Sequence, residues 1–257
     1  MLEKVIMRDR AIVLTGLIIT VILSWAYILN GAGMNMDMNM SMPASMQMGG
    51  ASAIWTPGYW VLMFVMWWVM MVAMMLPSAA PMILLFATVN KGAALKESRA
   101  VPTFVFAAGY LIIWGGFSLL AVFAQWALTS LSLLDQMMQS NSRFLGAALL
   151  ISAGLYQFTP VKDACLKNCK SPVQFIMSHW IPRRIGALKM GLLHGVFCLG
   201  CCWFLMGLLF FGGVMNILWI GGLALYVLLE KLMPNGGIVE KIVGGILVIW
   251  GGVMIAS

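Results

Sequence analysis

The charge-free stretch MGLLHGVFCLGCCWFLMG, residues 190–207, decides how the rest of the sequence is interpreted. It is apolar enough to lie in a lipid bilayer, yet it holds one of the two histidines and three of the five cysteines of the chain. Residues three or four apart share one face of a helix. The spacing therefore predicts one stripe on a membrane helix, formed by Met190, His194, Cys198, Cys201, Cys202 and Met206. Imidazole, thiol and thioether groups on one stripe predict a site for a soft metal ion.

The composition predicts a polytopic membrane protein. Of the 257 residues, 62% are hydrophobic and only 9% are charged, which is too little charge to cover the surface of a water-soluble domain. We therefore expect an all-α fold, a single membrane domain over residues 1–257 built as a helical bundle. The net charge of +7 does not indicate nucleic-acid binding, because the basic residues are spread over short loops and act as topology signals.

About seven apolar segments are candidates for transmembrane helices. They are residues 11–29, 59–90, 102–128, 144–158, 190–211, 217–229 and 242–256. The first is interpreted as an uncleaved helix, with a signal peptide as the alternative. Pro77 and Pro81 predict a kink or break in the second, because proline removes a backbone donor. With a cytoplasmic N-terminus, 14 of the 15 Lys and Arg residues lie in the cytoplasm, all except Arg143.

Residues 30–57 contain no Lys or Arg and form an extracytoplasmic loop in this topology. In its core, MNMDMNMSMPASMQM (residues 34–48), methionine alternates with small polar residues, so core packing does not explain it. The alternating methionines are Met34, Met36, Met38, Met40 and Met42. Thioether sulfur favours Cu(I) or silver over zinc. The loop is therefore predicted to collect copper at the outer face.

The second apolar segment carries two further ladders of methionine at steps of four. The predicted ligands among them are Met70, Met71, Met74 and Met75. At about 1.5 Å of rise per residue, these methionines and the cysteines of residues 198–202 both fall near the middle of the membrane. They are therefore expected to complete one intramembrane site. The alternative is packing, because methionine is a common gap filler in apolar cores.

Two more cysteines, Cys165 and Cys169, lie four residues apart in the basic segment 159–188, which is expected to be a cytoplasmic loop. They are candidate metal ligands, and a redox pair or an inert role stays open. Glu230 precedes Lys231 at the end of an apolar segment, where a helix-end role is expected.

Four strings in this sequence resemble a known family: MWWVMMVAMMLPSAAP, YQFTPVKDACLKNCKSP, HGVFCLGCCWFLM and LLEKL. They are similar to the bacterial predicted metal-binding integral membrane protein family, a domain-of-unknown-function group, over residues 59–232. The resemblance implies metal binding in a membrane, with no transport or catalytic activity attached to it. The positions that match its motifs are Met70, Met74, Met75, Pro77, Pro81, Cys165, Cys169, His194, Cys198, Cys201, Cys202, Met206, Glu230 and Lys231.

A weaker similarity links the chain to eukaryotic copper importers. These also place Met-rich segments outside the membrane and a Met-x-x-x-Met pair within a span. Seven spans do not fit their fold.

These observations predict a copper(I)-binding protein of the bacterial inner membrane that is not an enzyme. It would capture copper on the outer loop and transfer it to the intramembrane site, for transport or for delivery. The expected partners are membrane lipid, the copper ion, and a membrane copper enzyme or a periplasmic copper chaperone, with homo-oligomers left open and nucleic acid excluded. Two alternatives remain: a membrane thiol–disulfide oxidoreductase, and a non-catalytic subunit of a membrane copper-enzyme complex.

Overall fold

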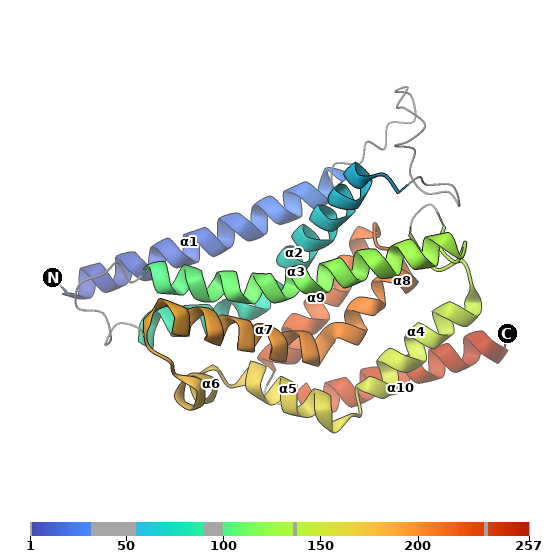
Figure 1. Ribbon diagram of the computed structural model, residues 1–257. Helices are drawn as coiled ribbons and strands as arrows, with labels where there is room; N and C mark the ends of the chain where they lie inside the picture. Colours follow the sequence, from blue (N-terminus) through green and yellow to red (C-terminus); the bar gives the residue numbers. More distant parts are fainter. Residues whose placement is uncertain (1, 32–54, 90–99, 136–137, 234–235, 257) are drawn as a thin grey trace.

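The protein is an all-α bundle in the computed structural model, which describes residues 2–31, 55–89, 100–135, 138–233 and 236–256 (Figure 1). These ranges contain long apolar helices, shorter helices between them and no strand, so the predicted fold class is confirmed. The helices are α1 (Leu2–Leu29), α2 (Pro57–Val89), α3 (Ala100–Ser130), α4 (Arg143–Tyr156), α5 (Pro160–Lys170), α6 (Pro172–His179), α7 (Arg183–Gly207), α8 (Leu209–Gly212), α9 (Ile217–Leu232) and α10 (Gly236–Ala256).

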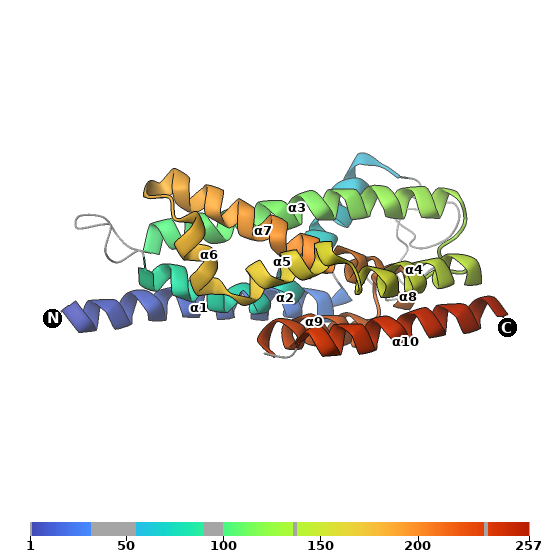
Figure 2. The ribbon, with the colours of Figure 1, turned by 90° about the horizontal axis from the view of Figure 1, so that it is seen from below.

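Five helical segments in the described chain are long and apolar enough to cross a membrane: α1, α2, α3, α7 continued by α8, and α10. The other two segments expected from the sequence correspond to α4 and α9, which have 14 and 16 residues and fall short of the roughly 20 that a crossing needs. Taken with α5, to which it is joined at a bend of 66°, α4 becomes a sixth candidate. The start of α1 and the end of α10 lie at opposite ends of the bundle (Figures 1 and 2).

Helix α2 continues through Pro77 and Pro81, so the break predicted there is not found. Side-chain hydrogen bonds and packing support this turn. The backbone carbonyl of Met75 accepts hydrogen bonds from the hydroxyl groups of Ser78 (2.8 Å) and Tyr110 (3.1 Å). Pro77 and Pro81 leave the carbonyls of Ala73 and Pro77 without their usual helical partners. A membrane helix can continue past such prolines where it is buried in protein, as this part of α2 is.

Helices α3 and α7 form the most extensive helix pair of the bundle, and glycine allows their backbones to touch. A Cβ atom on Gly191 would lie 2.1 Å from the carbonyl oxygen of Phe106, and one on Gly109 would lie 2.6 Å from that of Leu188. Neither position has room for a side chain. This close approach fixes the face of α7 that carries the histidine and the cysteines.

The basic segment 159–188 is not a loop, because it folds into α5, α6 and the start of α7. Helix α5 begins with Thr159 as its N-cap and Pro160 in its first turn, a combination that favours helix initiation. It packs against α7, and it buries Lys162 completely and Cys169 to 8% exposure. Part of this segment therefore belongs to the interior of the bundle.

The α3–α7 contact gives the first testable prediction. Gly191→Ala places a methyl group against the backbone of α3 and should lower the free energy of unfolding by about 1–3 kcal/mol. Gly116→Ala is the matched control on α3, because a Cβ atom there meets nothing within 4 Å. Thermal unfolding of both variants in detergent measures the difference, and equal melting temperatures would contradict the close contact.

Candidate metal centre

The predicted stripe on α7 faces the interior of the bundle. His194 is 3% exposed, and Cys198, Cys201, Cys202 and Met206 have no exposed surface. Three thiols and a thioether are therefore shielded from both water and lipid. The residue spacing in the sequence therefore predicted the buried face of α7 correctly.

Two of the three thiols on α7 are turned back toward their own helix. The Sγ atoms of Cys201 and Cys202 each donate to the carbonyl oxygen of Cys198, at 3.0 Å. This is the usual bond of a short polar side chain to a backbone carbonyl three or four residues earlier. The Cys198 side chain has different partners.

The sulfur of Cys198 lies between two polar groups that the sequence analysis did not place in the site. Its Sγ accepts a hydrogen bond from the ammonium of Lys231 on α9, at 3.0 Å, and lies 3.1 Å from the hydroxyl of Tyr110 on α3. Lys231 also donates to the hydroxyl of Ser78 on α2, at 2.9 Å. A lysine within an apolar bundle is by default a functional candidate, which is the signal that could have found it.

Methionine from α2 reaches the cysteines of α7, as the depth argument predicted. The Sδ atom of Met75 lies 4.0 Å from Sγ of Cys202. The neighbouring methionines of α2 are also buried, at 2% exposure or less: Met70, Met71 and Met74. The contact joins a thioether and a thiol from two different helices in one dry region.

The structure brings Cys169 into the same region, although the sequence placed it in a cytoplasmic loop. Its side chain, near the end of α5, is within hydrogen-bonding reach of Cys198 and Cys201. Cys165 lies one turn earlier, is partly exposed and packs against Gly200 of α7, where a Cβ atom would lie 2.7 Å from its sulfur. Four thiols therefore gather between α5 and α7, with Cys165 beside them.

The ring of His194 lies among aromatic side chains, and its Nδ1 has no hydrogen-bond partner. The ring centroids of Phe175, Tyr110 and Phe106 lie at 5.4, 5.6 and 6.1 Å. A buried ring nitrogen without a partner is unfavourable in a finished core. This nitrogen is therefore available as a metal ligand, one helical turn before Cys198.

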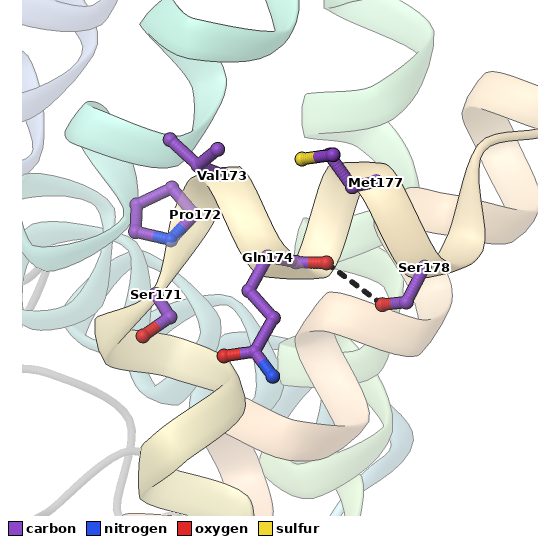
Figure 3. A pocket seen from close by; sticks show the side chains of 6 residues that line it. All are labelled: Ser171, Pro172, Val173, Gln174, Met177 and Ser178. Carbon is purple, nitrogen blue, oxygen red and sulfur yellow. Dashed lines mark hydrogen bonds between the residues drawn. The ribbon is translucent and has the colours of Figure 1, made fainter.

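The predicted outer ligands Met34, Met36, Met38, Met40 and Met42 lie outside the described residues. A surface pocket along α6 does not provide an alternative metal site (Figure 3). In it, Ser178 donates to the carbonyl of Gln174, and Met177 is 81% exposed. Its lining offers no group of metal ligands: Ser171, Pro172, Val173, Gln174, Met177 and Ser178.

Comparison with protein-family models matches residues 64–254 to PpoB2, described as a copper chaperone. The match covers well over half of the chain. The chain belongs to the PpoB2 copper chaperone family. Comparisons with curated proteins and with solved structures gave no match.

Membership of the PpoB2 family confirms the link to copper that the sequence predicted, although it does not test the particular metal-binding family named from the motifs. The matched range includes every predicted ligand on α2, α5 and α7, and it excludes the Met-rich segment before residue 57. The family match therefore covers most of α2 and the helices from α3 to α10, and it leaves out α1.

In the described parts of the chain, no three His, Cys, Asp or Glu side chains are arranged as a metal site. The hydrogen bonds of the three α7 cysteines explain this. Two thiols point at a backbone carbonyl, and the third is bonded to Lys231. The donors nevertheless fit a soft cation chemically, because they are buried thiol, thioether and imidazole groups.

The position of Cys169 can be tested by cross-linking. In a variant with Cys165, Cys201 and Cys202 changed to Ser, the two remaining thiols should form an intramolecular disulfide on treatment with diamide, because α5 packs against α7 and brings Cys169 close to Cys198. Mass spectrometry of alkylated protein, before and after reduction, measures the product.

The matched control keeps Cys165 and Cys198 and changes Cys169, Cys201 and Cys202 to Ser. It should remain alkylated at both cysteines. Alkylation of both Cys169 and Cys198 after diamide would show that α5 does not pack as described.

Proposed function

We propose that the protein is a membrane copper(I) chaperone that holds the ion on buried sulfur and passes it to a partner without chemical catalysis. The observation that carries the proposal is the 4.0 Å contact between Met75 Sδ and Cys202 Sγ, beside the thiols of Cys198 and Cys169. It occurs in a chain of the PpoB2 copper chaperone family. Copper is the cargo of this site.

The donor set favours the monovalent state of copper. Thiolate and thioether ligands select Cu(I), whereas divalent copper prefers nitrogen and oxygen in planar arrangements. Thioethers bind without losing a proton, while thiols must lose theirs. The proposed ligands are Cys198, Cys202 and Met75, with Cys169, Cys201 and His194 in reach of the same region.

Copper binding requires local rearrangement of side chains. The Cys202 thiol must rotate from the backbone carbonyl of Cys198 toward Met75. The ammonium of Lys231 occupies a lone pair of the Cys198 sulfur, so a copper ion must displace it. Ser78 already accepts a hydrogen bond from Lys231 and can retain it. The Lys231 ammonium therefore bonds the Cys198 sulfur only until copper(I) binds there.

The route of the ion follows from the proposed topology in a bacterial inner membrane. The N-terminus is cytoplasmic, so the Met-rich segment of residues 34–48 faces outward and collects copper for the buried site. The opposite ends of α1 and α10 in the bundle support this odd number of crossings. A periplasmic copper chaperone would supply the ion, and a membrane copper enzyme would receive it.

One observation favours a second function, thiol–disulfide exchange. Cys169 is within reach of Cys198 and Cys201 on another helix, and all five cysteines are free. Full burial of the α7 thiols opposes this function, because exchange requires an accessible thiolate. We therefore favour the copper chaperone hypothesis over oxidoreductase activity.

Copper(I) affinity tests the proposal. Cys198→Ser and Cys202→Ser should each weaken binding roughly tenfold or more, since loss of a ligand costs at least as much as loss of an outer-shell partner. Met75→Leu keeps the volume but removes the thioether and should weaken binding by a smaller factor. Competition with bathocuproine disulfonate under anaerobic conditions measures the affinity of the purified protein.

Two controls match these variants. Met82→Leu removes another buried methionine of α2, and Cys165→Ser removes the partly exposed cysteine of α5. Both should bind copper like the unaltered protein. Unchanged affinity in the Cys198, Cys202 and Met75 variants would rule out the buried site.

A further inference from the structure

A second buried cluster, made of charged groups, lies where α5, α9 and α10 meet. The ammonium of Lys162 on α5 lies 2.5 Å from Glu230 Oε1 on α9 and 3.6 Å from Glu240 Oε2 on α10. It also donates to Oε1 of Gln157, at the end of α4. Lys162 and Glu230 have no exposed surface, and Glu240 is 2% exposed. The proposed copper site uses none of these side chains.

The cluster has an imbalance of charge. Two carboxylates, Glu230 and Glu240, face the ammonium of Lys162. The next lysine, Lys231, donates instead to Cys198 and does not balance the pair. With both glutamates ionised, the group carries one excess negative charge away from water. An uncompensated buried charge is strongly unfavourable, and such a site normally neutralises itself by binding a proton.

Unpartnered polar atoms point to the same conclusion. Oε2 of Glu230, Oε2 of Glu240 and Nε2 of Gln157 are each buried without a hydrogen-bond partner. A proton on one carboxyl group converts a surplus acceptor into a donor. The amide of Gln157 is held at the cluster by Lys162, so its N–H groups remain available to an ionised carboxylate or a water molecule.

The surrounding groups do not remove the excess charge. Asp163 and Lys170 of α5 act on Glu240 with opposite signs. On α9, the Tyr226 hydroxyl donates to Oε1 of Glu230 at 3.3 Å, which leaves Oε2 unpaired. A metal ion is also disfavoured, since no third His, Cys, Asp or Glu ligand joins the glutamates in the described chain.

We propose that Glu240 is a buried proton-binding site, which holds one proton at neutral pH because Glu230 forms the closer ion pair with Lys162. The proton enters from the water at the end of the bundle where α9 ends and α10 begins, because Glu240 lies near the start of α10. Lys231, which donates a hydrogen bond to the Cys198 sulfur, directly follows Glu230 in the chain. The proton-binding cluster and the sulfur region are therefore connected through successive residues of α9.

Infrared spectroscopy of the full-length, copper-free protein in nanodiscs tests this site independently of copper binding. At neutral pH we expect a carbonyl stretch from one protonated carboxyl group, which moves to lower frequency in D₂O. Glu240→Gln and Glu230→Gln should each reduce this band by at least half. Absence of the band in the unaltered protein, or its full persistence in both variants, would overturn the proposal.

Two further variants keep the test decisive if a glutamate variant does not fold. Lys162→Met removes the ammonium, so both carboxyl groups should bind protons and the band should approach twice its area. Asp135→Asn, in the exposed turn after α3, is the control and should leave the band unchanged. A Lys162→Met band no larger than that of the unaltered protein would contradict the charge argument.

Discussion

The contact between the Lys231 ammonium and the Cys198 sulfur is the interaction on which the rest of the structure depends. The two atoms are 3.0 Å apart, and both side chains are buried in the bundle. An ammonium in an apolar interior requires acceptors, because its desolvation is otherwise uncompensated. Cys198 on α7 and Ser78 on α2 supply them, so one side chain of α9 ties three helices together around the sulfur atoms.

Helix α9 connects two polar regions of the bundle through successive residues. Neighbouring residues of a helix point about 100° apart. Glu230 therefore reaches Lys162 on α5, while Lys231 reaches Cys198 on α7. The same helix α5 brings Cys169 to the thiols. The ion-pair cluster thus helps to hold α5, which also carries the fourth thiol, against α9 and α10.

The sequence predicted the features that depend on local periodicity. The all-α bundle and the buried face of α7 follow from steps of three and four, and the meeting of Met75 with Cys202 follows from equal depth along two helices. The continuity of α2 through its prolines was not predicted, because the local sequence does not show that the surrounding helices bury this part of α2.

Features that depend on long-range pairing were missed. Basic composition suggested that residues 159–188 form a solvated loop. Lys162 is buried because its partners, Glu230 and Glu240, lie far away in the chain. Tyr110 could not be distinguished from other aromatic residues without the position of Cys198.

The most direct test of the buried sulfur site is X-ray absorption at the copper edge of the full-length, copper(I)-loaded protein labelled with selenomethionine. Selenium distinguishes methionine from cysteine in the first shell of the metal. Coordination by Met75 and the α7 cysteines predicts both selenium and sulfur neighbours on the same copper ion. A shell of nitrogen and oxygen alone, or of selenium without sulfur, would contradict a site shared between α2 and α7.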